Sequence, residues 1–195
     1  MLIGPRTCIR KRGSFASASA AAALVLAMAG PQAAAQSTSG PWRGFVEGAN
    51  AHNAQALRIG GSLDWPSSWK LGPVRIAGYT EVTIGRWRLE PDARLDRAYF
   101  TQVGVTPVVR FYGGETEGLF FEAGIGANVI APKYHSKHRE QGSTFNFGDH
   151  VGLGWRSSGP AAWEATLRFE HFSNAGIREP NPGKNWTELR LGAAF

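Results

Sequence analysis

One run of the sequence reads Val74-Arg75-Ile76-Ala77-Gly78-Tyr79-Thr80-Glu81-Val82-Thr83-Ile84-Gly85. Its even positions are mainly apolar, whereas its odd positions are mainly charged, polar or small. Successive side chains of a β-strand point to opposite faces of the sheet. This alternation therefore predicts a strand with one apolar face and one polar face.

The same alternation recurs along the chain, for example at Leu119–Val129, Trp163–Phe169 and Leu189–Phe195. Beyond residue 35 no run reaches the ~18 consecutive apolar residues of a spanning helix. Eight strands of about 9–11 membrane-crossing residues, with their turns, fit the remaining length. The predicted strands lie near residues 43–51, 55–65, 72–88, 96–112, 117–131, 143–157, 161–174 and 186–195.

Two barrel architectures fit eight alternating strands. A soluble barrel of the lipocalin kind turns its apolar side chains inward, whereas a membrane barrel turns them outward and fills its interior with polar residues. The polar faces carry charges of both signs, which can pair in a narrow interior: Arg58, Asp64, Arg75, Glu81, Glu122, Asn128, Arg168, Glu170, Glu188 and Arg190. Tryptophans lie near strand ends, as in interfacial girdles: Trp65, Trp69, Trp87, Trp155 and Trp163. The sequence thus predicts an all-β fold, an eight-stranded antiparallel transmembrane β-barrel.

The links between strands alternate between two kinds. Those around 66–71, 113–117 and 157–160 are short, whereas those at 132–142 and 175–185 are longer and polar. Outer-membrane barrels have short periplasmic turns and longer outer loops. We therefore expect a multi-pass protein of the bacterial cell outer membrane, with the end of strand 161–174 in the outer leaflet.

The first 35 residues have the layout of a secretory signal peptide. A basic start is followed by the short apolar run 18–30 and by a small-residue cleavage site at Ala33-Ala34-Ala35. We therefore divide the chain into a signal peptide, 1–35, and an outer-membrane barrel, 36–195. The formal charge of +6 includes four basic residues of the signal, so the barrel carries only about +2 and a nucleic-acid partner is not indicated. The single cysteine, Cys8, lies in the signal, so the barrel has neither disulfides nor a cysteine metal site.

A histidine and a serine lie close together near the end of strand 161–174. By parity His171 and Ser173 share the predicted lipid-facing side with Phe169. Polar side chains in such positions need hydrogen bonds, and a histidine paired with a serine is also how a serine nucleophile is activated. The alternative is a pair of interfacial residues solvated by lipid headgroups, and spacing alone does not decide between the two.

The wider segment is more specific. The run His171-Phe172-Ser173-Asn174-Ala175-Gly176-Ile177, followed by Pro180-Asn181-Pro182-Gly183, resembles the lipid A 3-O-deacylase family of PagL-type outer-membrane barrels. The resemblance implies a carboxylic ester hydrolase that removes the 3-O-linked acyl chain from lipid A of lipopolysaccharide without metal or cofactor. It also implies that Ser173 is the nucleophile, that His171 is the general base, and that the backbone amides of Asn174 and Gly176 form an oxyanion hole.

The third catalytic position departs from the family pattern, which places a glutamate fourteen residues after the histidine. Here that residue is Asn185. An asparagine can orient an imidazole through its carbonyl oxygen, but it does not offset the imidazolium charge. We rank Asn185 first for this role, Glu188 second although parity sends it into the lumen, and the loop residue Glu179 third.

Other histidines and charges give weaker signals. His135 and His138 could bind a metal, but no supporting ligand set accompanies them. Their basic loop, with Arg178 and Lys184, either meets lipopolysaccharide phosphates or is simply solvated. Residues expected in the barrel interior or at its rim, without chemical roles, are Asp149, His150 and His52.

Three rival functions remain open. They are an outer-membrane phospholipase of the same architecture, which an asparagine at the third position favours, a non-enzymatic structural or adhesive barrel, and a soluble lipocalin-like binder. Whether the barrel forms homodimers is also open.

Overall fold

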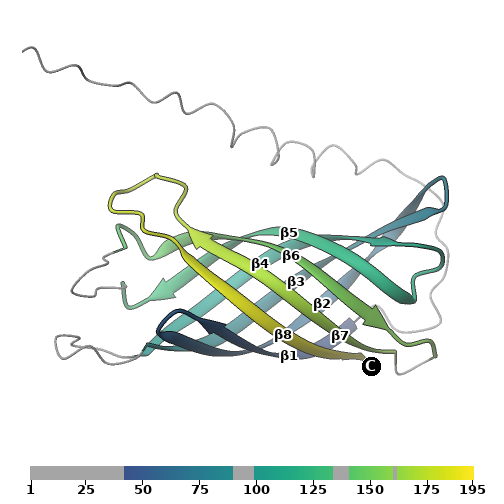
Figure 1. The fold of residues 1–195 in the computed structure, drawn as a ribbon, viewed down its shortest axis with the longest axis horizontal. Coiled ribbons are helices and arrows are strands. Elements are labelled where there is room, and N and C mark those ends of the chain that lie inside the picture. Colours follow the sequence, from purple (N-terminus) through teal and green to yellow (C-terminus); the bar gives the residue numbers. More distant parts are fainter. Residues whose placement is uncertain (1–41, 90–98, 134–140, 160–161) are drawn as a thin grey trace, which may run out of the picture. The chain divides into compact units, whose positions relative to one another are not determined.

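The computed structural model describes residues 42–89, 99–133, 141–159 and 162–195. The predicted signal peptide, residues 1–35, and both His135 and His138 lie outside this part of the chain. None of the described residues belongs to a helix long and apolar enough to cross a membrane. The eight strands are β1 (Trp42–Ala51), β2 (Ala54–Leu71), β3 (Val74–Leu89), β4 (Tyr99–Tyr112), β5 (Gly118–Ala131), β6 (Phe145–Arg156), β7 (Trp163–Ser173) and β8 (Lys184–Ala194) (Figure 1).

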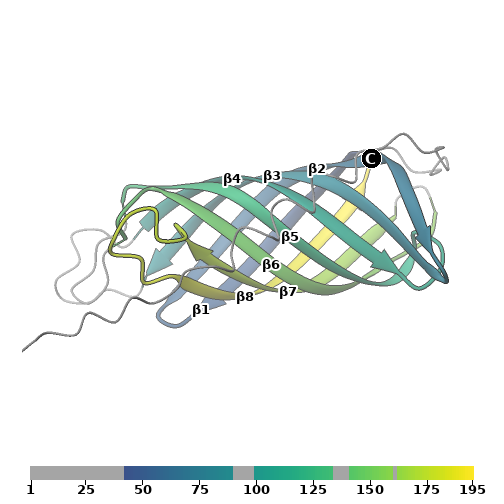
Figure 2. The same cartoon turned by 90° about the horizontal axis from the view of Figure 1, so that it is seen from above.

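The strands form a closed antiparallel barrel in sequence order (Figure 2). Closure occurs where β1 pairs with β8: Glu47 of β1 is in register with Arg58 of β2 on one side and with Arg190 of β8 on the other. Each strand is thus hydrogen-bonded to a neighbour on both sides, as a membrane interior requires. The predicted eight-stranded fold is confirmed.

Strand β2 is longer than the sequence predicted. We expected a strand ending near residue 65 and a link at Pro66–Leu71, but the strand continues to Leu71. Its register against β3 shifts between Asp64 and Ser68. Such a bulge accommodates Pro66, which cannot donate a backbone hydrogen bond to the ladder. A proline such as Pro66 can indicate either a turn or a bulge, so the sequence alone did not distinguish the two.

The outer surface of the barrel is apolar. Leu57, Leu119 and Leu167, from three different strands, are 62%, 64% and 58% exposed. Each lies on the apolar face of its alternating strand, and the polar face of the same strand is buried. This is the reverse of a soluble barrel, so the lipocalin-like alternative is wrong and the surface is that of a barrel built to lie in a bilayer.

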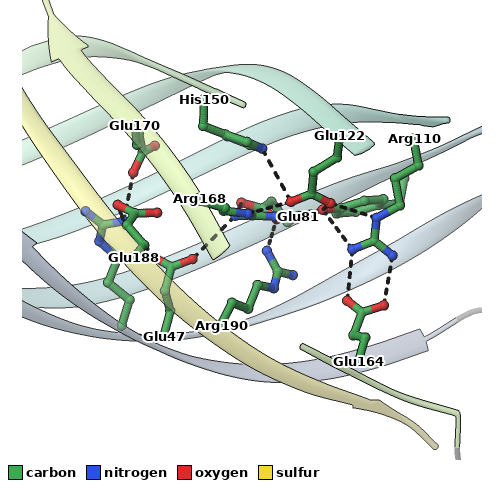
Figure 3. Close-up of polar contacts among 12 residues, drawn as sticks. Glu47, Glu81, Arg110, Glu122, His150, Glu164, Arg168, Glu170, Glu188 and Arg190 are labelled. Atoms are coloured by element: carbon green, nitrogen blue, oxygen red, sulfur yellow. Dashed lines mark hydrogen bonds and ion pairs between the residues drawn. The ribbon is translucent and has the colours of Figure 1, made fainter. Parts of the chain in front are cut away.

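The interior of the barrel is held by ion pairs (Figure 3). Glu122 of β5 accepts hydrogen bonds from Arg110 of β4 at 2.7 Å and from Arg168 of β7 at 2.6 Å. Arg110 also donates to both oxygens of Glu164, at 2.8 and 2.9 Å. Arg168 reaches Glu81 of β3 at 3.2 Å. Buried charges are tolerated when they are paired in this way, and the predicted polar lining is confirmed.

A second cluster of interior charges surrounds Arg58. Its Nη1 atom lies 2.7 Å from Glu47, 2.8 Å from Glu170 and 2.5 Å from Glu188. The three carboxylates come from β1, β7 and β8, so this guanidinium joins those strands to β2. The inside of the wall that carries His171 is therefore fixed by charge-assisted hydrogen bonds.

Three aromatic side chains, Trp87, Phe172 and Trp186, form what we term the aromatic plug inside the barrel. The Trp87 ring lies 5.0 Å from Phe172 and 4.7 Å from Trp186, between centroids, and all three are buried. The prediction that Trp87 belongs to an interfacial girdle is wrong, because its odd position turns it inward. Trp155 and Trp163 do face outward, with centroids 5.0 Å apart, at the opposite end of the barrel.

Candidate active site

His171 and Ser173 lie on the outer face of β7, at the end of the strand. They share this face with Phe169, which is 51% exposed, and both are half-buried. Phe172, between them in the chain, points into the barrel and is fully buried in the aromatic plug. The predicted orientation, outward and away from the barrel axis, therefore agrees with the structure. Because Phe172 anchors this end of β7 in the interior, His171 and Ser173 on either side of it must point outward.

Asn185 supports the imidazole. It is in register with His171 across β7 and β8, and its Oδ1 atom lies 2.5 Å from Nδ1 of His171. Because an amide oxygen only accepts, Nδ1 carries the proton in this arrangement. The Nε2 atom is then left with its lone pair, which is the state that a general base requires.

Gly183 lies against the other edge of the imidazole. Its φ of +64° is in the left-handed region that favours glycine. A Cβ atom built there would be 2.7 Å from Cε1 and 3.2 Å from Nε2 of His171. The absence of a side chain at Gly183 thus leaves the space that the imidazole occupies.

Ser173 lies beside an aromatic surface. Its cross-strand neighbour is Phe147 of β6, whose ring packs edge-on against Phe145 with centroids 5.1 Å apart. In the described part of the chain the Ser173 hydroxyl has no hydrogen-bond partner, His171 included. Catalytic hydrogen bonds often form fully only with substrate, so the pairing of these two side chains stays a prediction.

The turn after Ser173 is organised by Asn174. This side chain is fully buried, and its Nδ2 donates to the carbonyl of Arg178 at 2.6 Å and to Oγ of Ser143 at 3.2 Å. It thereby holds the β7–β8 connection against the segment before β6. Ala175 and Gly176 follow with φ values of +52° and +76°, which reverse the chain immediately after the serine.

Both backbone amides expected to form the oxyanion hole already have acceptors. The amide of Asn174 donates to Oδ1 of Asn181, and the amide of Gly176 donates to Oδ1 of Asn174, each at 3.0 Å. The two amides therefore follow Ser173 directly in the chain, but in this structure each donates its hydrogen bond to a side chain of the turn. Asn181 is the residue that sequence reasoning did not connect to these amides.

The two other candidates for the third position do not contact His171. Glu188 is buried inside the barrel, where it accepts a hydrogen bond from Arg58. It lies on the opposite side of the wall from the imidazole, so it cannot serve. Glu179 is exposed in the β7–β8 connection and accepts the amide of Asn181 at 3.0 Å. The structure favours Asn185.

Asp149 was expected in the interior or at the rim, and this expectation is wrong. It lies on the outer face of β6, in register with His171 of β7. The alternation of β6, in which Val151 and Leu153 face outward, is the signal that would have placed it. Its neighbour His150 is buried inside, with Nε2 3.9 Å from Glu122, as expected.

Over residues 42–89, 99–133, 141–159 and 162–195, no group of three or more His, Cys, Asp or Glu is arranged to hold a metal ion. The loop with His135 and His138 is outside these ranges.

Two curated proteins are similar in sequence. One is the lipid A deacylase PagL of Bordetella bronchiseptica, 42% identical over 94 residues, which are 48% of this chain and 50% of that protein. The aligned region thus spans about half the length of this relative. The other is the lipid A deacylase PagL of Pseudomonas aeruginosa, 28% identical over 138 residues, which are 70% of this chain and 76% of that protein.

A crystal structure described as the outer membrane enzyme PagL has the same fold. It superposes with a TM-score of 0.65 at 24% identity, covering 77% of this chain and 97% of that one. Residues 55–194 match the sequence profile described as lipid A 3-O-deacylase (PagL), a match that runs from the second residue of β2 to the end of β8 and includes all the site residues above. The chain belongs to the lipid A 3-O-deacylase (PagL) family.

Proposed function

We propose that this chain is an outer-membrane esterase that removes the 3-O-linked acyl chain from lipid A by a serine–histidine mechanism. Family membership and the names of both relatives support the reaction. The observation that carries the proposal is the position of the site. Ser173 and the bonded pair His171–Asn185 lie on the outer surface of the barrel, on the side that faces away from the lumen.

The proposed orientation brings the site to its substrate. If both chain ends face the periplasm, as the loop lengths predict, the ends of β7 and the β7–β8 connection lie in the outer leaflet. Lipopolysaccharide occupies that leaflet. Phe147 beside Ser173, and the exposed Phe169 on the same face of β7, offer apolar surface for acyl chains.

The chemistry is acyl transfer to water. Nε2 of His171 takes the proton of the Ser173 hydroxyl as Oγ attacks the ester carbonyl, and then gives it to the oxygen of the departing sugar hydroxyl. The acyl group is now an ester of Ser173. A water molecule, deprotonated by the same Nε2, attacks this ester, the fatty acid leaves, and Ser173 regains its proton.

The oxyanion is assigned to the amides of Asn174 and Gly176. In the resting arrangement these amides donate to the side chains of Asn181 and Asn174. The carbonyl oxygen of the substrate would replace those acceptors as negative charge develops on it. One donor in such a site contributes about 3–4 kcal/mol to the transition state.

Cationic side chains near the site suit the phosphates of lipid A. Arg178 is exposed in the β7–β8 connection. Lys184, at the start of β8, donates through Nζ to the carbonyl of His52 at 2.6 Å, which holds its ammonium at the rim of the barrel. Both are proposed to contact phosphate, with guanidinium making the paired hydrogen bonds that phosphate favours.

Lipid A mass spectrometry tests the proposal. Membranes that contain the wild-type protein should yield lipid A lacking one ester-linked hydroxyacyl chain, and membranes with Ser173→Ala or His171→Asn should not. Heat-dependent mobility in gels confirms that each variant is folded. Intact lipid A in the presence of folded wild type contradicts the proposal.

The alternative activity is that of a phospholipase, which the asparagine at position 185 favours. The same membranes should then contain lysophospholipid and free fatty acid, both dependent on Ser173. If neither lipid A nor phospholipid differs between wild type and Ser173→Ala, the barrel is structural or adhesive.

A further inference from the structure

The outer face of β6 is apolar except at one position. Its outward residues are Phe145, Phe147, Asp149, Val151, Leu153 and Trp155. Asp149 is exposed, and in the described part of the chain it has neither a hydrogen-bond nor an ion-pair partner. A carboxylate on a lipid-facing surface carries a free-energy cost that its apolar neighbours avoid. A role in folding therefore does not explain why an aspartate occupies position 149.

Asp149 lies directly beside His171. The register runs from Asp149 on β6 to His171 on β7 and then to Asn185 on β8, so the imidazole has one of these residues on each side. Opposite residues of an antiparallel pair have Cβ atoms about 4.5–5.5 Å apart. The side chains of Asp149 and His171 are not bonded in this structure, in which Nδ1 of the imidazole is engaged by Asn185.

Among the described residues, the other side chains that lie around His171 on this outer face carry no charge. Asn185 of β8 and Gly183 of the β7–β8 connection contact its ring, and Phe169 and Ser173 flank it on its own face of β7. When Nε2 takes the serine proton, the ring becomes an imidazolium beside lipid. Asn185 orients this ion but does not neutralise it. A carboxylate at the distance of a cross-strand neighbour favours the charged form.

We propose that Asp149 is a positioning residue for the reaction, which supplies the negative charge that Asn185 lacks. Orientation and charge compensation, which a single carboxylate combines in a Ser-His-Asp triad, are here divided between β8 and β6. The proposal rests on the serine–histidine part of the proposed function. It acts through His171, and Asp149 itself touches no reacting atom.

Four proteins test this division: wild type, Asp149→Asn, Asn185→Asp, and the double variant. Asp149→Asn should lower kcat by roughly 10-fold with little change in KM. The acid limb of its pH–activity profile should move to lower pH, because the charged imidazole loses the carboxylate beside it. A structural role would lower activity without moving that limb.

The double variant provides a rescue. A carboxylate at position 185 contacts Nδ1 directly, so it should make Asp149 dispensable. We expect the double variant to recover to within about 3-fold of wild type, a coupling between the two sites that independent effects would not give. Glu115→Gln, which removes a carboxylate 70% exposed at the opposite end of the barrel, is the control and should leave the profile unchanged.

A fluorophosphonate probe separates this inference from the choice of substrate. Ser173 Oγ displaces fluoride from the probe and forms a stable phosphonyl ester when the serine is activated, whatever lipid the enzyme cleaves. Labelling should be slower in Asp149→Asn and restored in the double variant. If wild type labels but leaves lipid A intact, the deacylase proposal fails while the role of Asp149 is still measured.

Three results would overturn the inference. One is a profile of Asp149→Asn that superposes on that of wild type. Another is a loss that Asn185→Asp does not rescue. The third is a rise in KM alone, which would assign the carboxylate to substrate binding.

Discussion

The amide oxygen of Asn185 lies 2.5 Å from Nδ1 of His171, across the pair β7–β8. This contact fixes which nitrogen carries the proton and leaves Nε2 for the proton exchange with Ser173 that we propose. It also shows how a chain without a glutamate at this position can still orient the imidazole that we propose as the base. The consequences of the contact, and of the packing around it, are open to measurement.

Removing the amide oxygen should impair catalysis without unfolding the barrel. Asn185→Ala leaves the imidazole free to rotate and to adopt the other tautomer, so we expect kcat to fall by about 10²-fold, because small misplacements of a catalytic group have effects of that size. Release of hydroxyacyl chains from lipid A measures the loss. Activity equal to that of wild type would move the orienting role to another residue.

The space at Gly183 should be essential for the site. Gly183→Ala brings a Cβ within 2.7 Å of Cε1 of His171, so the ring must shift and activity should fall by about 10²-fold. Gly72→Ala is a matched control, because Gly72 also has a left-handed φ, +59°, yet has no atom near its Cβ position. Equal effects of the two substitutions would indicate backbone strain rather than contact with the imidazole.

Asn174 should matter through its side chain as well as its amide. Asn174→Ala removes donors to Arg178 and Ser143 and the acceptor for the amide of Gly176. We expect a loss of about 1–3 kcal/mol in the free energy of unfolding, because several buried polar groups lose partners, together with loss of activity. Chemical denaturation in lipid vesicles gives the first quantity. Full activity in the folded variant would contradict the structural role of this turn.

The buried carboxylate of Glu122 should be among the strongest determinants of stability. Glu122→Gln leaves Arg110 and Arg168 facing a neutral group, and breaking such a pair destabilises a protein by about 3–5 kcal/mol. The exposed pair between Glu115 and Arg75 is the comparison, with an expected effect of about 0–1 kcal/mol. Denaturation midpoints in vesicles should separate the two variants. Similar midpoints would mean that the interior charges do not stabilise the barrel.

Alternation with a period of two was sufficient to predict the barrel, because a closed sheet with one apolar face has one arrangement in lipid. It placed Ser173 and His171 on the outer surface for the same reason. The prediction failed at Pro66, where a bulge and a turn have the same local sequence. It also failed at Trp87, which lies near a strand end as girdle residues do but whose odd position turns it into the barrel.

The remaining differences concern contacts between segments distant in sequence. The sequence indicates that Asn174 and Gly176 follow Ser173, but not that the side chains of Asn181 and Asn174 accept hydrogen bonds from their amides. The position of Asp149 beside His171 depends on the register of β6 against β7, which two separate strands decide together. Neither the acceptors of these amides nor the pairing of Asp149 with His171 can be predicted from the residue spacing within one segment.

Because the aromatic plug and the ion pairs occupy the interior, Ser173 faces outward and is half-buried on the outer surface of the barrel. If Ser173 is the nucleophile, as we propose, the lipids next to β6, β7 and β8 form the other side of the reaction site. Acyl-chain order and the lateral pressure of the leaflet consequently act on turnover as directly as a mutation in a pocket would. The same protein transferred to a more rigid bilayer should work more slowly with no alteration to its own atoms.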